Sequence, residues 1–122
     1  MNQEKLQTVA ETTIFAKRAE AILSPEEKDE LIYTLADDPL AGVEIPDTGG
    51  VRKLRWAARG KGSKGGVRVI YFFHNEHSPL YALYIFGKGE KEDLTPEEKR
   101  AMKQLAAKLK TAAKEKSRRA GR

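Results

Sequence analysis

The sequence predicts a single α+β domain in which an antiparallel sheet carries two N-terminal helices on one face and is followed by a C-terminal helix. The length of 122 residues corresponds to about one domain. Two proline-containing helix starts, at 24–27 and 95–98, lie on either side of three strand-like segments. Short connections join these segments, and parallel neighbours would need crossovers of about a dozen residues or more. The predicted order is β-α-α-β-β-β-α, within one domain over residues 1–122.

The N-terminal part begins with a predicted edge strand at residues 5–9, followed by a helix that Thr12 or Thr13 can cap. A hydroxyl at this position accepts a hydrogen bond from a backbone N–H that has no partner inside the helix. The apolar stripe of this helix is Phe15, Ala19, Ile22 and Leu23.

The second helix has a stronger start signal, because Ser24 and Glu27 form a capping box around Pro25 at the first helical position. The helix should end near Asp37, since the residue before a proline avoids the helical conformation. Its predicted buried stripe is Leu31, Ile32, Leu35 and Ala36.

The middle of the chain should supply the sheet. A connection rich in Gly and Pro follows at 40–50, and a strand is expected at 51–58. Alternation places Lys53 and Arg55 on one face of this strand, and Leu54 and Trp56 on the other, in the core. Two more strands are expected at 67–74 and 80–86, where apolar residues run almost continuously.

The last helix should begin with a second capping box, formed by Thr95 and Glu98, and run to about Lys116. Residues 117–122 are expected to form a basic, disordered tail, because they have no apolar side chain to bury. The predicted buried stripe of the helix is Met102, Leu105, Ala106, Leu109 and Ala113.

Charge is divided unevenly along the chain. Residues 1–50 hold four basic and eleven acidic residues, a net charge of −7, whereas residues 51–122 hold nineteen and seven, a net charge of +12. The second part is therefore suited to a polyanion such as nucleic acid, although a charged run is more often a solvated surface.

Several classes of site are disfavoured by composition. The chain has no cysteine, which removes disulfides, thiolate zinc sites and cysteine nucleophiles. Only His74 and His77 remain as histidine ligands, and we expect neither a metal nor a cofactor. There is no apolar run of membrane-spanning length and no apolar leader, so a cytoplasmic protein with no membrane partner is expected.

The stretch GGVRKLRWAARGKGSKGGVRVIYFF offers many cations and few carboxylates. Such a set suits binding of phosphate better than metal coordination or hydrolysis by two carboxylates. Arg68 stands in a strand otherwise made of core residues, where a charge is costly unless it faces a cleft or has a partner. Arg55 and Lys53 are candidates for the same function, but two cations on an exposed face of a strand are also common without any functional role.

Two stretches also carry a family resemblance: DDPLAGVEIPDTGGVRKLRWAARGKGSKGGVRVIYFF and YIFGKGEKEDLTPEE. The most specific pattern is GG-x-RK-x-RW followed by GG-x-R-x-IY. With the element order, they resemble the RelE/HigB superfamily of bacterial toxin–antitoxin toxins, especially its HigB-like branch, over residues 8–109. The resemblance implies a ribosome-dependent mRNA endonuclease acting on mRNA in the ribosomal A site. It also implies a cognate antitoxin, expected to be a HigA-like helix-turn-helix protein.

The implied cleavage needs no metal, because the substrate's own 2′-hydroxyl attacks the adjacent phosphate. The protein must activate this hydroxyl, stabilise the charge of the transition state and protonate the leaving 5′-oxygen. Four residues are predicted to be catalytic, and four more to bind RNA. The catalytic set is Arg68, Arg55, Lys53 and Lys88, and the RNA-binding set is Lys61, Lys64, Lys91 and Arg52.

Gly89 follows Lys88, where the narrow RelE group has an arginine, and the tyrosine that stacks on the substrate base in that group is also missing. The proton-transfer groups therefore stay open. A lysine with a lowered pKa, a histidine, Tyr71 or Tyr84 could serve, although histidines in a turn, such as His74 and His77, more often titrate in solvent.

The loop at 60–65 formally matches the G-x-G-x-x-G nucleotide fingerprint, but a strand follows it where the fingerprint needs a helix. Its glycines permit either close approach of Lys61 and Lys64 to an RNA backbone or a plain flexible turn. Two other functions stay open as well. One is a non-catalytic RNA- or ribosome-binding inhibitor, and the other, less favoured, is a structural partner or antitoxin.

Overall fold

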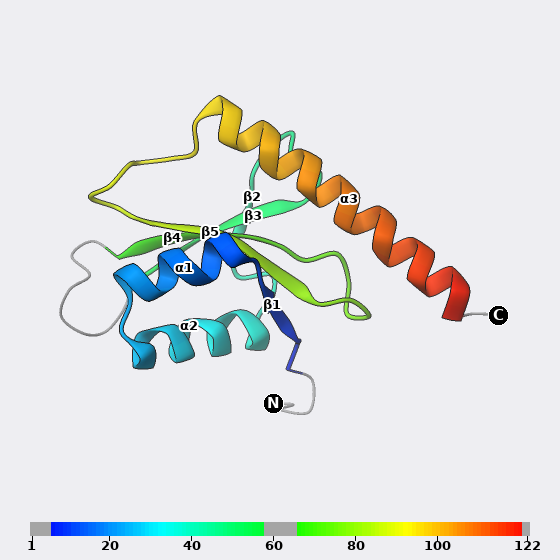
Figure 1. Ribbon diagram of the computed structural model, residues 1–122, viewed down its shortest axis with the longest axis horizontal. Helices are drawn as coiled ribbons and strands as arrows, with labels where there is room; N and C mark the ends of the chain where they lie inside the picture. The colour runs from blue at the N-terminus through cyan, green and yellow to red at the C-terminus, as the bar shows by residue number, and fades with distance from the viewer. Residues whose placement is uncertain (1–5, 58–65, 121–122) are drawn as a thin grey trace.

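The computed structural model describes residues 6–57 and 66–120. Within them the chain forms three helices and a five-stranded sheet (Figure 1). The elements, in chain order, are β1 (Val9–Glu11), α1 (Thr13–Ile22), α2 (Pro25–Asp37), β2 (Val43–Glu44), β3 (Val51–Trp56), β4 (Val67–Phe72), β5 (Leu80–Gly87) and α3 (Pro96–Ala120).

The sheet has the strand order β1-β5-β4-β3-β2. The meander of β3, β4 and β5 is antiparallel, as predicted, and β2 extends it antiparallel to β3. At the other edge β1 runs parallel to β5, so the sheet is mixed rather than purely antiparallel. A parallel edge is possible here because α1 and α2 lie between β1 and the meander in the sequence and provide the long crossover.

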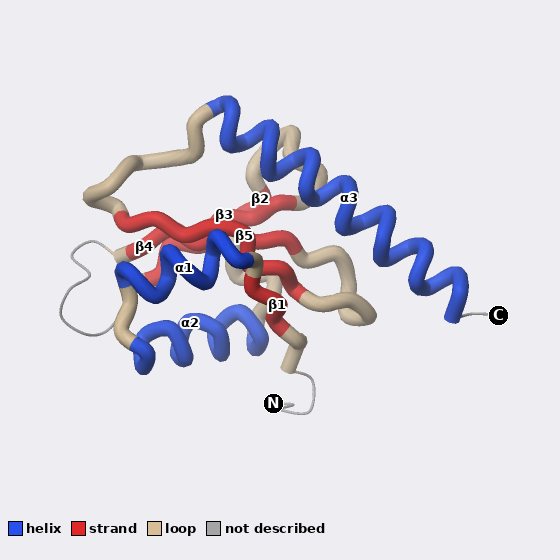
Figure 2. Tube along the Cα trace, viewed as in Figure 1, coloured by secondary structure: helices blue, strands red, loops and turns tan. Residues whose placement is uncertain are grey.

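Helices cover both faces of the sheet. Helices α1 and α2 lie side by side against one face, and α3 crosses the other and continues beyond it (Figure 2). Two apolar clusters correspond to these layers. The α1/α2 cluster includes Phe15, Leu31, Leu35, Val69 and Ile85, and the α3 cluster includes Val51, Ile70, Phe72, Phe86 and Ala106.

The predicted helix starts are confirmed in atomic detail. The Thr12 hydroxyl accepts a hydrogen bond from the Phe15 N–H at 3.1 Å. In the two capping boxes, Ser24 and Thr95 each accept from the N–H three residues later, at 3.1 Å, while Glu27 and Glu98 each accept from the cap N–H at 2.8 Å. These local signals therefore position the helices as the sequence predicts.

Strands β3 and β4 each end two residues before their predicted ends. Three larger differences concern β1, β2 and α3. The first strand lies at Val9–Glu11 rather than 5–9, since it pairs with Leu80–Ala82 and then leads directly into the Thr12 cap. The predicted connection at 40–50 contains the short strand β2. Helix α3 continues to Ala120, so residues 117–120 are helical rather than a disordered tail. Cations are favourable near a helix C-terminus, and alanine and arginine are strong helix formers.

Candidate functional site

Arg55 and Arg68 lie directly opposite each other on β3 and β4, and Phe86 lies opposite Arg68 on β5. Alternation along β4 puts Arg68 on the same face as Ile70, which packs in the α3 cluster. Residues directly opposite in an antiparallel pair have Cβ atoms about 4.5–5.5 Å apart, so the two arginine side chains leave the sheet from neighbouring points. Neither arginine forms an ion pair with any residue that the structure describes.

Lys53 extends this cationic surface by one row. It shares the face of Arg55, lies opposite Ile70, and its Nζ is 3.1 Å from an Asp93 carboxylate oxygen. Partial burial works to raise the pKa of Asp93. The Leu94 N–H, Lys53 and Lys99 outweigh that effect and hold the pKa below its ordinary value. Asp93 is therefore ionised near neutral pH.

Lys91 completes the surface above β5. Its Nζ lies 5.5 Å from the ring centre of Tyr84 and 5.4 Å from that of Phe86, and it is within 2.5 and 2.6 Å of the two Glu98 carboxylate oxygens. The hydrogen bond to Glu98 raises the pKa of Lys91 above its ordinary value, against the opposing effect of desolvation. Lys91 is thus a fixed ammonium group that keeps its proton and acts as a permanent positive charge on this surface.

A second cation borders the Tyr84 ring. The Arg18 guanidinium lies 4.9 Å from the ring centre, and its Nε donates to the Ile85 carbonyl at 2.6 Å. Arg18 also forms an ion pair with Glu90, and this hydrogen bond is the main reason that the pKa of Glu90 is lowered. The Tyr84 ring is therefore bordered by Arg18 and Lys91, and its hydroxyl is 3.5 Å from Glu98.

The structure brings four of the predicted site residues to one surface: Arg68, Arg55, Lys53 and Lys91. Lys88 is exposed in the turn after β5, where its backbone N–H donates to the Gly66 carbonyl at 3.3 Å. Lys61 and Lys64 lie outside the described residues.

Arg52, the remaining predicted RNA-binding residue, does not join this surface. Arg52 lies opposite Tyr71, on the α1/α2 side of the sheet, and its Nη1 donates to the Gly42 carbonyl at 2.6 Å. Successive residues of a strand point to opposite faces, so Arg52 cannot share the surface of Lys53 and Arg55. Its role here is to hold the chain before β2.

The fold places Tyr71 and Tyr84, the two tyrosines considered as proton-transfer groups, on different sides of the sheet. Tyr71 is fully buried on the α1/α2 side, where its hydroxyl donates to the Pro39 carbonyl at 2.8 Å and accepts from the Gly42 N–H at 2.8 Å. Burial raises the pKa of Tyr71, so this tyrosine has a structural role. Tyr84 lies on the cationic surface. His74 stacks near Phe72 just after β4, whereas Arg68 is near the start of the strand.

Sequence reasoning missed the carboxylates of this surface. Asp93 and Glu98 lie beyond the basic stretch in the sequence, where Asp93 has no predicted role and Glu98 is predicted only as part of a helix start, yet each contacts a site lysine. The available signal was the unusual density of charge in KGEKED, directly after a buried strand.

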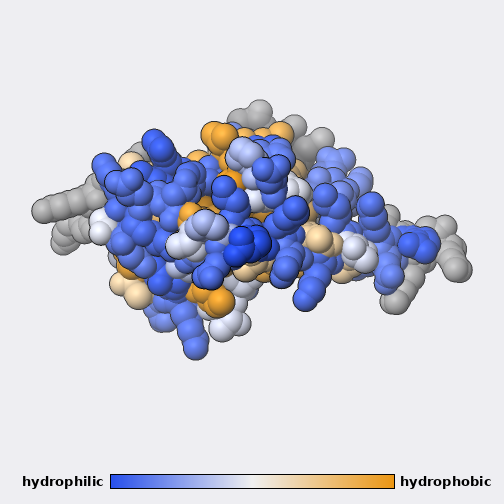
Figure 3. Space-filling model, turned by 90° about the horizontal axis from the view of Figure 1, so that it is seen from above, coloured by the Kyte–Doolittle hydropathy of each residue, from blue (hydrophilic) through white to orange (hydrophobic). Residues whose placement is uncertain are grey.

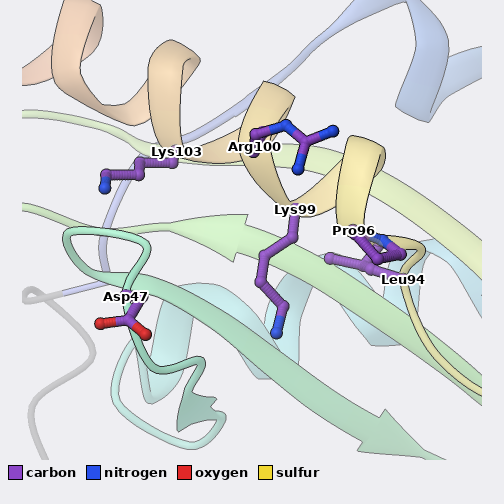
Figure 4. Close-up of a pocket in the computed structure, with 6 residues that line it drawn as sticks. All are labelled: Asp47, Leu94, Pro96, Lys99, Arg100 and Lys103. Carbon is purple, nitrogen blue, oxygen red and sulfur yellow. The ribbon is translucent and has the colours of Figure 1, made fainter.

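A shallow cavity of about 310 Å³ lies beside the start of α3. Lys99 and Lys103 extend from α3 on the side of the turn that carries Asp47, whereas the Arg100 guanidinium points the other way (Figure 4). Within 6–57 and 66–120 there is no group of three His, Asp or Glu side chains that could hold a metal. No helix in these ranges is long and apolar enough to cross a membrane.

Residues 9–121 match the family described as the RelE toxin of the RelE/RelB toxin–antitoxin system. The chain belongs to the RelE toxin family. The fold is also similar to that of E. coli toxin RelE, solved in the free state as a mutant with two arginines replaced by alanine, at a TM-score of 0.51 and 12% sequence identity. The match covers 71% of this chain and 88% of the E. coli RelE chain. The predicted superfamily and its RelE-like fold are thereby confirmed, and the HigB-like branch stays a prediction.

Proposed function

We propose that this RelE-family toxin is a ribosome-dependent endoribonuclease that cleaves mRNA in the ribosomal A site and so inhibits translation. The observation that carries the proposal is the direct opposition of Arg55 and Arg68, with Lys53 and Lys91 on the same face. Like charges opposite each other in a sheet are unfavourable in the free protein. They are useful when a phosphate with added negative charge lies between them.

The reaction is a transfer of the phosphoryl group within the RNA. The 2′-oxygen forms a bond to the adjacent phosphorus, the bond from phosphorus to the 5′-oxygen breaks, and a 2′,3′-cyclic phosphate remains on one product. One proton leaves the 2′-hydroxyl, and one proton is delivered to the departing 5′-oxygen. No metal or cofactor takes part in this scheme.

Arg55 and Arg68 would bind the non-bridging phosphate oxygens, for which a planar guanidinium provides paired donors. Asp93 is ionised and hydrogen-bonded to Lys53, so its carboxylate can accept a hydrogen bond from the 2′-hydroxyl and orient it. Lys91 retains its proton and suits electrostatic stabilisation of the negative charge that develops on the departing 5′-oxygen. Lys88 remains a predicted catalytic residue, and Lys61 and Lys64 remain predicted RNA contacts.

The cationic surface also suits inhibition by a cognate antitoxin. An acidic segment of that protein, which we expect to be HigA-like, could cover Arg55, Arg68 and Lys53 and exclude RNA. Because mRNA and ribosomes are found in the cytoplasm, we expect the activity to take place there.

The test is inducible expression of the wild type beside Arg68→Ala in bacteria, with primer extension on an abundant translated message. Growth arrest with new in-frame cuts, both lost in Arg68→Ala, is the expected result. Arg100→Ala is the matched control, since it removes an exposed arginine of α3 that points away from the Asp47 turn.

Arrest without cuts would replace this proposal with a ribosome-binding inhibitor that has no catalytic step. In that case Arg68→Ala should lose ribosome affinity only in proportion to the contact removed. Absence of arrest from a well-expressed, folded wild type would contradict both readings.

A further inference from the structure

Helix α3 carries a stripe of four lysines along one side, at spacings of four, seven and four residues. An α-helix has 3.6 residues per turn, so these spacings place all four within a narrow sector of its surface. We call this set the lysine stripe: Lys99, Lys103, Lys110 and Lys114.

The lysine stripe begins beside the candidate site. Lys99 is close enough to Asp93, the partner of Lys53, to interact electrostatically with its carboxylate. Lys99 and Lys103 line the cavity next to Asp47 (Figure 4). Further along, Lys110 Nζ donates to the Gly49 carbonyl at 3.3 Å. The first three lysines therefore follow the edge of the domain from the site outward.

Beyond Leu109 the helix leaves the body of the domain, and the stripe goes with it. No large apolar side chain follows Leu109 in α3, and Lys114 is exposed. The face seen from above in Figure 3 is mostly hydrophilic, with apolar side chains gathered in small patches. This part of α3 is thus available to a ligand that is recognised by charge.

The placement of charge differs from that of an ordinary solvated helix. Lys99 and Lys103, like Lys110 and Lys114, are four residues apart, a spacing at which like charges repel. The helix has three carboxylates, of which Glu97 and Glu115 fall on the other side together with Lys108, and Glu98 pairs with Lys91. None of the four stripe lysines forms an ion pair with another described residue. A solvated helix would gain stability by alternating the signs, whereas a polyanion would neutralise this repulsion.

We propose that the lysine stripe is a second phosphate-binding surface, which holds the backbone of a single RNA strand as it leaves the candidate site. The inference rests on the proposed ribonuclease function for the identity of that strand. From Lys99 to Lys114 the stripe spans about 22 Å of helix, at 1.5 Å per residue. Its start beside Lys53 and Asp93 favours a strand continuous with the one in the site over a separate duplex.

The experiment compares two double variants of the full chain, Lys110→Ala/Lys114→Ala on the stripe and Lys108→Ala/Lys116→Ala on the rest of the same helix. Each removes two positive charges from the outer part of α3 and makes the same change in helix propensity, and neither touches the candidate site. Binding of a labelled single-stranded RNA and of a duplex RNA is followed by fluorescence anisotropy over a series of salt concentrations. Circular dichroism checks the fold.

For the stripe variant we expect single-strand affinity to fall about tenfold near 0.1 M salt, with the salt slope reduced by about 1.4, or about 0.7 per lost phosphate contact. The control variant should keep a slope close to that of the wild type. Equal losses of RNA affinity in the two variants would overturn the proposal, because RNA would then respond to the overall positive charge of the helix and not to the stripe. Preferential binding of the duplex would also overturn it. So would unchanged RNA affinity combined with weaker binding of polyglutamate, which would assign the stripe to an acidic protein.

This readout is separate from cleavage. If the wild type makes no cuts but only the stripe variant loses RNA affinity, the stripe is supported as an RNA-binding surface and the ribonuclease proposal fails. If cuts appear but the two double variants bind RNA alike, the stripe proposal fails alone.

Discussion

At the scale of single residues, Arg55 and Arg68 combine a cost in stability with a use in binding. Their side chains leave adjacent strands at directly opposed positions. A like-charge pair in this arrangement destabilises a sheet, since cross-strand pairs contribute roughly 0.2–1 kcal/mol in either direction. The folded protein should therefore become more stable when one of these two arginines is replaced by an uncharged residue.

We therefore predict that Arg68→Gln raises the free energy of unfolding by about 0.2–1 kcal/mol while lowering cleavage about 100- to 1000-fold. Glutamine keeps part of the apolar stem and removes the charge. Urea unfolding and a ribosome-programmed cleavage assay measure the two effects. Arg100→Gln should change neither. A variant that is both less stable and inactive would indicate that Arg68 acts through packing.

Tyr71 provides the opposite case, a residue that matters for stability and not for chemistry. Its hydroxyl bonds both the Gly42 N–H and the Pro39 carbonyl in the interior. Tyr71→Phe leaves both without that partner, so the free energy of unfolding should fall by about 1–3 kcal/mol, as measured by urea denaturation. Cleavage by the folded variant should be unchanged. A loss below about 0.5 kcal/mol would mean that water replaces the hydroxyl.

At the scale of elements, three ion pairs tie the connection between β5 and α3 to helix α1, to strand β3 and to the first turn of α3. These are Arg18–Glu90, Lys53–Asp93 and Lys91–Glu98. All three carboxyl groups have pKa values below their ordinary values. For Glu98, burial acts to raise the pKa, but hydrogen bonds from Lys91 and from the Thr95 N–H lower it by more.

This arrangement predicts a loss of stability in acid. A carboxyl group with a lowered folded-state pKa stabilises the protein above its unfolded-state pKa, about 4.3 for Glu, and this contribution disappears as the pH falls through the folded-state pKa. Glu98→Gln removes the charge and keeps a capping-box side chain. Its unfolding free energy should therefore decrease less than that of the wild type between about pH 5 and pH 3.

Urea denaturation across this pH range is the measurement, and Glu97→Gln is the control from the same helical turn. Glu97 forms no ion pair with any residue in the described ranges. A pH profile of Glu98→Gln identical to that of the wild type would show that the Lys91 pair contributes nothing to folding.

At the scale of the whole molecule, the sheet separates two electrostatic environments. The α3 side presents Arg55, Arg68, Lys53 and the lysine stripe. The opposite side is formed in part by α2, which contains five carboxylates and one lysine: Glu26, Glu27, Asp29, Glu30 and Asp37, with Lys28. RNA should therefore approach from the α3 side.

Removal of residues 112–122 should leave the domain folded, because Leu109 is the last large apolar residue of α3 against the core. The free energy of unfolding should change by less than about 0.5 kcal/mol in urea denaturation, as is usual for surface changes. Truncation after Ala101 should instead prevent folding or cost several kcal/mol, since Met102, Leu105, Ala106 and Leu109 are lost. A large effect of the shorter deletion would contradict this view of the outer helix.

Much of the fold could be predicted from the sequence because its signals are local. The capping boxes at Ser24 and Thr95 depend on residues three apart, and the alternation in β3 fixes the face of Lys53 and Arg55. The same alternation argues against Arg52 in the site. The predicted end of α3, at about Lys116, is too early, because charged residues that contribute nothing to the core can still continue a helix.

The sequence by itself determined the three helix starts, the antiparallel meander with its cationic strands, and the family resemblance. Only the tertiary structure decided which tyrosine lies on the cationic surface, and that Asp93 and Glu98 pair with Lys53 and Lys91. The physical reason is that capping and alternation act between near neighbours in the chain. The partners of a side chain across a sheet depend instead on strand order and on the path of the connection after β5, which no local pattern encodes.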